Sequence, residues 1–441
     1  MLAKFKSYKK QDWFKLFFKL TLGLFIISIP WQTRWIIYAW QMGDSVWEYG
    51  LISLYASEII LLLAAIFFGL SHKQEAYFSK SKFLYFLFVY SVVVAMLTPA
   101  PAVSLYYLFL IYSAALFAYL LKFVKKNFIF RMFLVSGLLE SILAITQTLE
   151  QRVWANKWLG LAEHLPEKLG TIVIEVGDQR ILRAYGSLPH PNVLGGFLFV
   201  TIFLGVCLWI NFYKASEQAP DIKGFFKKRI WEFLFIILSL VLMTFGLLAS
   251  FSRGAILALI LSLFSVLIIN IFKRQWLTVS LVAKYAVIFA AVLMVFNWWW
   301  PGAYSSRLSM SSRLEQKSAS ERVDTLDQLG WENYRVGFFG QGLGMNTLTT
   351  FYKKSNIHTY DVQPIHDIFL LMFAEVGVIG VFLLFNVVRR IIKSANQVDI
   401  MSTSLILGLV VIGLFDHYLW TSWTGWLLMS LALFNLYRSR V

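Results

Sequence analysis

Twelve apolar runs, separated by mostly short polar connections, restrict the fold of this sequence more than any other feature. An α-helix needs about 20 mostly apolar residues to cross a bilayer, and most of these runs approach that length. Only 15% of the 441 residues are charged, whereas about one quarter would be charged in a soluble chain. The sequence therefore predicts an all-α integral membrane protein with about 12 transmembrane helices. The predicted helices cover residues 14–32, 51–70, 83–98, 103–121, 128–147, 192–212, 231–249, 254–272, 281–299, 365–388, 400–415 and 420–437.

Basic residues gather in every second connection, and this alternation predicts the orientation. The basic set comprises Lys4 to Lys10, Lys73 to Lys82, Lys122 to Arg131, Lys214 to Arg229, Lys273 with Arg274, Arg389 to Lys393, and Arg438 with Arg440. Among the short connections of the other set, basic residues are rare. Because cytoplasmic connections are enriched in Lys and Arg, we expect the basic set, with both termini, on the cytoplasmic side. The net charge of +16 is thus explained by contact with the lipid bilayer, and we expect no nucleic-acid partner.

Two connections on the opposite side are long, and they divide the chain. We expect helices one to five over 1–147, an outer loop over 148–191, helices six to nine over 192–299, a large outer loop over 300–364 and the last three helices over 365–441. Between β-branched residues, Gly177-Asp178 predicts a β-hairpin near 172–183. Ser320 suits the N-cap of a short helix over 321–335. These short elements are expected to pack as a lid on the outer, extracytoplasmic face.

Two arginines on the outer side are candidates for an anion site. Arg183 begins a segment that ends at Asn192, a suitable N-cap for the sixth helix, where Gly195-Gly196 allows close packing. Arg253 lies in the very short turn before the eighth helix. A guanidinium binds phosphate oxygens in a bidentate manner. The alternatives are an interfacial arginine beside a helix cap for Arg183 and snorkelling to the surface for Arg253.

Histidine and acidic residues on the same side could carry proton transfer. His366 opens the tenth predicted helix, and an imidazole titrates near neutrality, so it could act as a general base or have a purely structural role. Asp416-His417 could orient His366 or contact substrate, or could be an interfacial pair among aromatic residues. Acidic side chains within apolar helices suggest function by default, but each could instead bond a neighbouring helix. These acids are Glu58, Glu140 and Glu375.

No residue pattern points to a cofactor or a metal. Cys207 is the single cysteine, and no Cys/His spacing is typical of a metal site. No phosphate-binding loop followed by Lys-Ser/Thr is visible. We therefore expect neither a metal ion nor a nucleotide at the site.

At these residues the chain resembles the O-antigen ligase and O-antigen polymerase superfamily. The resemblance rests on Arg183 to Gly186 with His190-Pro191-Asn192, on Ser252-Arg253-Gly254, on Gly340-Gln341-Gly342-Leu343-Gly344, and on His366 with Leu370, Glu375, Gly377 and Gly380. These motifs cover about residues 180 to 390, and their order and shared side make the set specific, although each motif alone is weak. The family more often has Asn or Ser where this chain has Asp367.

The resemblance implies a metal-independent membrane glycosyltransferase. Such an enzyme moves a glycan from an undecaprenyl-pyrophosphate carrier to a hydroxyl of a lipid core sugar, of another lipid-linked repeat or of a protein. The resemblance also implies that the family's essential arginines correspond to Arg183 and Arg253 and its essential histidine to His366. Two alternatives remain: a transporter or flippase of an anion or lipid, for which inverted repeats are not evident, and a non-catalytic scaffold in envelope assembly.

Overall fold

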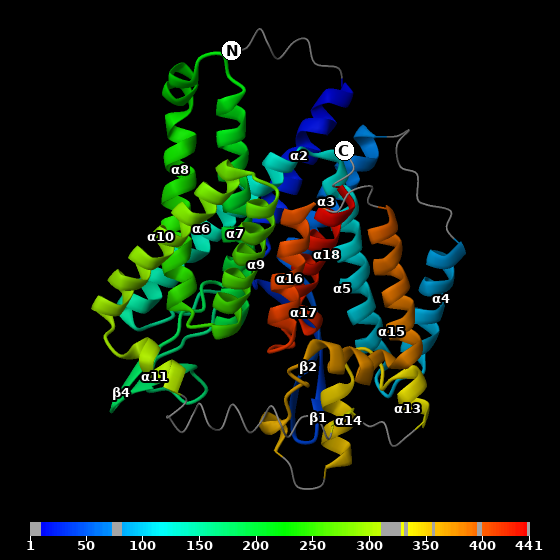
Figure 1. Cartoon of the computed structure of the whole chain (residues 1–441). Coiled ribbons are helices and arrows are strands. Elements are labelled where there is room, and N and C mark those ends of the chain that lie inside the picture. The colour runs from blue at the N-terminus through cyan, green and yellow to red at the C-terminus, as the bar shows by residue number, and fades with distance from the viewer. Residues whose placement is uncertain are drawn as a thin grey trace.

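The computed structural model describes residues 10–72, 82–309, 328–329, 334–354, 358–394 and 399–438. Helices dominate it, and Figure 1 shows most of them running in a similar direction through one bundle. Each of the twelve predicted segments overlaps a helix. These helices are α2 (Lys10–Ser28), α3 (Ala56–Ser71), α4 (Lys82–Met96), α5 (Pro101–Leu120), α6 (Lys126–Glu150), α7 (Pro191–Glu217), α8 (Ile222–Ala249), α9 (Arg253–Phe272), α10 (Trp276–Trp299), α15 (Ile368–Ser394), α16 (Ile400–Gly413) and α18 (Trp423–Arg438).

The described helices identify a multi-pass membrane protein. Seven are long and apolar enough to cross a membrane: α5 with the 3-10 turn that follows it, α6, α7, α8, α9, α10 and α15. Shorter apolar helices accompany them at Ala56–Ser71, Phe83–Met96, Ile400–Gly413 and Trp423–Leu436. The apolar window of α7 is 100% buried inside the protein. A helix that is apolar all round and buried all round is the centre of such a bundle.

Two hairpins and several short helices gather at one end of the bundle, which we call the hairpin end (lower part of Figure 1). The hairpins are β1 (Arg34–Met42) with β2 (Ser45–Tyr55), and β3 (Val173–Val176) with β4 (Gln179–Leu182). The short helices are α11 (Ala303–Ser309), α13 (Tyr334–Phe339), α14 (Asn346–Lys353) and α17 (Tyr418–Thr421). The 3-10 turn η3 (Thr359–Asp361) lies beside the start of β2, and a second 3-10 turn, η1 (Leu121–Phe123), follows α5. The hairpin predicted near 172–183 is confirmed, with Val176 opposite Gln179 across the Gly177-Asp178 turn.

The β1–β2 hairpin corrects the all-α prediction. Residues 51–55 belong to strand β2, although the sequence predicted a helix from residue 51. The helix begins only at Ala56, because the Glu58 carboxylate accepts a hydrogen bond from the Tyr55 amide at 2.7 Å and thereby caps its first turn. The hairpin is held to the large outer loop by the Trp47 indole, which donates to Thr347 Oγ1 at 2.8 Å.

The described parts of the two long connections, 148–191 and 300–364, contact each other and the end of α8. The Ser306 hydroxyl of α11 donates to the Glu175 carbonyl of β3 at 2.5 Å. From the same helix, the Tyr304 hydroxyl donates to the Leu248 carbonyl of α8 at 2.7 Å. Short helices within 300–364 are therefore confirmed. The helix predicted over 321–335 lies largely outside the described residues.

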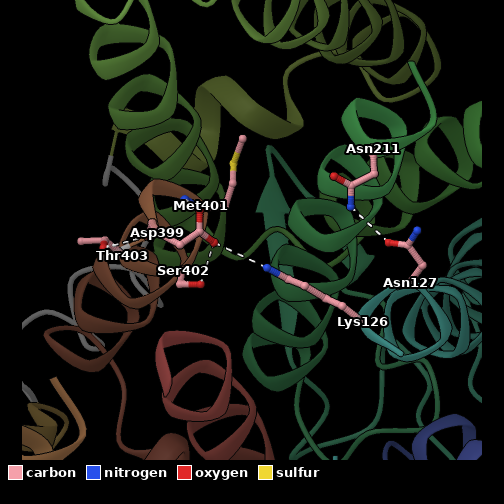
Figure 2. A network of polar contacts seen from close by, with 7 residues as sticks. All are labelled: Lys126, Asn127, Asn211, Asp399, Met401, Ser402 and Thr403. Carbon is pink, nitrogen blue, oxygen red and sulfur yellow. Dashed lines mark hydrogen bonds and ion pairs between the residues drawn. The ribbon is translucent and has the colours of Figure 1, made fainter. Parts of the chain in front are cut away.

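At the opposite end of the bundle, a polar network joins α6 to α16 (Figure 2). Lys126 Nζ lies 3.5 Å from Asp399 Oδ2. Asp399 also accepts from the Ser402 hydroxyl at 3.0 Å and caps the first turn of α16. One carboxylate therefore both begins a helix and ties it to its neighbour.

Candidate functional site at the hairpin end

The segment that carries Arg183 is fixed to α6 by two polar side chains. Gln147 Oε1 accepts from the Tyr185 and Gly186 amides, both at 2.9 Å. The Glu140 carboxylate accepts from the Ser187 amide at 2.7 Å and from its hydroxyl at 2.6 Å. A buried acid is costly unless it is bonded in this way. Glu140 therefore has a structural partner, and that partner is the candidate site segment.

Arg183 is buried and joins this segment to the turn between α8 and α9. Its Nε donates to the Ser250 carbonyl at 2.9 Å, and its Nη2 donates to Asn192 Oδ1 at 2.5 Å. The adjacent Ala184 amide donates to the Ala249 carbonyl at 3.0 Å. Because Arg253 follows Ser250 by only three residues, this docking brings the two arginines, which are far apart in the sequence, into one region.

Close packing around two glycines of α7 makes the arrangement possible. A Cβ on Gly195 would lie 2.5 Å from Ser252 Cβ, and a Cβ on Gly196 would lie 1.7 Å from the Tyr418 hydroxyl. Only glycine lets both neighbours approach α7 this closely. Gly195-Gly196 thus bring the turn before α9 and the start of α17 against the same helix, as the sequence suggested.

Asp416 continues the chain of bonds from Arg183. Asn192 Nδ2 donates to Asp416 Oδ2 at 2.7 Å, so Asn192 links the guanidinium to this carboxylate. The Asn192 amide donates to His190 Nδ1 at 2.9 Å, which makes His190 the cap of α7. The prediction of Asn192 as this cap is therefore wrong, and the Asn192 side chain instead bonds to Arg183 and Asp416.

Aromatic contacts bring His366 to the same place. The rings of His366 and His417 meet edge to face with centroids 5.4 Å apart. The Tyr49 ring of β2 lies 6.0 Å from the His417 ring, and His417 Nδ1 is 2.8 Å from Thr421 Oγ1. Three segments that are distant in the sequence therefore meet at His417.

Burial and charge set the ionisation of the cluster. Burial lowers the pKa of Arg183 to about 10, although Asp416 acts in the opposite direction, so the guanidinium stays charged at neutral pH. Burial also lowers the pKa of His190 to about 3 and that of His417 to about 4. For Asp416, burial alone would raise the pKa, but the nearby histidines and the Asn192 bond outweigh it and hold the pKa below its usual value. At neutral pH the cluster thus combines a cation, an anion and at least two neutral imidazoles.

Arg253 begins α9 near this cluster. Its Nη1 donates to the Arg307 carbonyl of α11 at 3.0 Å. A Cβ on Gly254 would lie 3.9 Å from Phe415 Cβ, the neighbour of Asp416. Arg253 also lies within electrostatic range of Arg183. Arg183 is buried, and its positive charge therefore lies beneath the surface of the cluster. The half-buried members that form this surface are Arg253, Asn192, His366, Asp416 and His417.

Asp367 caps α15, and this role explains how Asp can replace the Asn or Ser that is more common in the superfamily which this chain resembles. Its Oδ1 accepts from the Phe369 amide at 2.8 Å and from the Leu370 amide at 3.0 Å. Asn, Ser and Asp are all good N-caps, so Asp at this position keeps the structural role of either residue.

We expect Asp367→Asn to retain thermal stability, because the amide oxygen preserves the cap. Asp367→Ala should destabilise the protein by about 1 kcal/mol. Thermal unfolding of the purified variants in detergent checks both outcomes. An Asp367→Asn protein that unfolds as easily as Asp367→Ala would contradict the capping role.

Glu375 organises the glycine-rich loop beside His366. It accepts from the Trp420 indole at 2.8 Å and from the Asn346 amide at 3.5 Å. Two residues later α15 kinks at Gly377, whose φ of 62° is unfavourable for other residues. The carbonyls near the kink accept from the Gln341 and Gly342 amides at 2.8 and 2.9 Å. Hydrogen bonds to α15 therefore hold the loop over 340–344 in place.

Two contributors to the site were missed in the sequence. Tyr49 belongs to the unexpected β1–β2 hairpin, whose Gly43-Asp44 turn repeats the signal that revealed the other hairpin. Asn346 accepts from the Ile365 amide at 3.3 Å and so positions the residue before His366. Nothing in the local sequence around Asn346 signals this contact.

The fold and the site together define a multi-pass membrane protein with a cluster of arginines, histidines and one aspartate at one end of its bundle. Residues 238–385 of this protein match the family model described as O-antigen ligase, which confirms the resemblance over that stretch. The matched stretch includes Arg253, His366 and Glu375, while Arg183 precedes it and Asp416 follows it. Among curated proteins, no match is found.

Proposed function

We propose that this protein transfers a glycan from an undecaprenyl-pyrophosphate carrier to an acceptor hydroxyl on the outer face of the cytoplasmic membrane. The observation that carries the proposal is the bonded chain Arg183–Asn192–Asp416, with Arg253 and His366 beside it. The match to the O-antigen ligase family supports a lipid-linked glycan as substrate. The polar cluster combines the cations and the imidazole that such a reaction needs.

The two arginines have different roles in this proposal. Arg253 is half-buried and meets the diphosphate directly with its forked donors. Arg183 is buried, and two of its five N–H donors go to Ser250 and Asn192. It supplies fixed positive charge beneath the diphosphate and holds Asn192 against Asp416. Fixed cations stabilise the negative charge that develops on the leaving pyrophosphate.

His366 is the proposed general base. The acceptor oxygen attacks the anomeric carbon, the bond from that carbon to the pyrophosphate oxygen breaks, and the acceptor proton passes to His366. Asp416, ionised and within electrostatic range of His366, stabilises the imidazolium that forms. A single displacement of this kind inverts the anomeric centre and requires no metal.

The proposed topology has twelve membrane crossings, with both termini in the cytoplasm and the hairpin end outside. The charge pattern of the connections supports it. The divisions at 1–147, 148–191, 192–299, 300–364 and 365–441 follow from these crossings. The carrier's lipid tail then stays in the bilayer, and only its diphosphate and glycan reach the cluster.

A transporter would use a broken helix to expose backbone groups to its cargo. The break in α15 at Gly377 does not favour that alternative, because carbonyls near the break accept hydrogen bonds from Gln341 and Gly342. The break instead seats the glycine-rich loop close to His366.

One incubation separates the possible activities. Purified protein in liposomes receives lipid-linked repeats alone, or repeats with a lipid core acceptor. Lengthening of the repeats without a separate acceptor identifies a polymerase, and transfer only in the presence of the core sugar identifies a ligase. A correctly folded protein that forms no product with these acceptors or with a protein acceptor, in the absence and presence of divalent metal, would contradict the proposal.

A further inference from the structure

The base of the β1–β2 hairpin exposes an unusual run of large apolar side chains. Four consecutive residues of β1 are exposed: Trp35 by 74%, Ile36 by 48%, Ile37 by 61% and Tyr38 by 55%. Successive residues of a strand point to opposite faces, so this run exposes apolar groups on both faces. Contiguous exposed apolar surface of this kind marks a contact with another apolar phase or partner.

The length of α3 places this base at the membrane boundary. At 16 residues, α3 is about 24 Å long, because an α-helix rises 1.5 Å per residue. The hydrocarbon core is about 30 Å thick. In the proposed topology α3 crosses this core and is about 6 Å shorter than it. The end of β2 that leads directly into α3, at Leu54 and Tyr55, therefore lies close to the boundary of the hydrocarbon. Their partners across the ladder are Trp35 and Arg34.

The free edge of β1 limits how deep the base can lie. Among the described residues the sheet has two strands, so half of the backbone groups of β1 point away from the ladder. Such an edge is not found in hydrocarbon, where water cannot satisfy it. The headgroup layer contains water and favours Trp and Tyr. Trp35, Tyr38 and Trp40 in this strand match that preference, with Arg34 at its start.

We propose that the base of this hairpin, residues 34–38 with 51–55, is inserted into the interfacial layer of the leaflet at the hairpin end. The exposed apolar face of α3, which includes Ile59, Leu62 and Leu63, continues the same surface into the bilayer. Lipid covers both faces of β1 at once, whereas a second copy pairing along the edge would leave one or both faces in water. The hairpin tip leaves the membrane and reaches α14 and η3.

Spin labelling in liposomes tests this placement without reference to the enzymatic activity. Cys207 is the single cysteine and is buried, so Cys207→Ala provides a background for one new cysteine. Ile37→Cys places a label at the base, and Asp44→Cys places the matched control label at the exposed tip of the same hairpin. Power saturation then compares collisions with oxygen, which concentrates in lipid, and with a water-soluble nickel chelate.

The label at residue 37 should show an oxygen-to-nickel collision ratio several-fold above that of the label at residue 44. Equal, water-like ratios at both positions would overturn the proposal. Dipolar broadening at residue 37 that disappears on dilution with unlabelled protein would identify a second copy as the occupant and would also overturn it. If Cys207→Ala does not fold, the wild-type background serves, with labelled protein lacking the new cysteine as the blank.

Discussion

Replacing His366 with alanine will reduce glycan transfer by about 10²–10⁴-fold, the usual contribution of a general base. The side chain is half-buried at the edge of a polar cluster, so its removal leaves the bundle intact. Transfer is measured with purified protein in liposomes, at saturating lipid-linked donor, and insertion is checked by size-exclusion chromatography. His358→Ala, eight residues earlier in the chain and exposed, is the matched control.

The test is the ratio of the transfer rates of His366→Ala and His358→Ala. A His366→Ala protein that elutes normally and retains wild-type transfer would remove His366 as the base. A loss of similar size in His358→Ala would show that the assay responds to the segment as a whole and not to the imidazole.

Arg183→Lys will reduce transfer by at least about tenfold, because each charged hydrogen bond that is lost costs about 1.5–3 kcal/mol. An ammonium group cannot reproduce the planar fork that reaches both the Ser250 carbonyl and Asn192. Asn192 would then lose its hold on Asp416, so the defect should appear in kcat as well as in the KM for the lipid-linked donor.

The control for this prediction lies in the β3–β4 hairpin that directly precedes Arg183. Arg180 is exposed on β4, and Arg180→Lys should transfer at the wild-type rate. Unchanged kcat and KM in Arg183→Lys would contradict the assigned role of the buried guanidinium. Thermal unfolding of both variants shows whether any loss reflects stability alone.

The helices were predictable because membrane crossing imposes a length and a composition that few other structures share. The β1–β2 hairpin was not predicted, because residues 51–55 continue directly into the apolar run of α3 and a short apolar run fits a strand or a helix. The Glu58 cap, which marks where α3 begins, is a local hydrogen bond between residues three apart, and hydropathy does not register it.

At the site, Arg183, Arg253 and His366 stood out in the sequence because each is polar at the boundary of an apolar run. For Asp416 the sequence left open a role beside His366 and a role as an interfacial residue, and its bond to Asn192, 224 positions away, is visible only in the fold. Tyr49 and Asn346 gain their places from contacts across the chain. Glu140 and Glu375 each bind one segment of the site. From the sequence, the role of these two acids was open.

The most direct test of the account is a cryo-EM structure of the protein in lipid with undecaprenyl pyrophosphate. The account predicts density for the diphosphate within hydrogen-bond distance, about 2.7–3.2 Å, of Arg253, with Arg183 beneath it and His366 facing the side from which an acceptor enters. Diphosphate bound away from this cluster, for example beside Lys126 at the opposite end of the bundle, would contradict it.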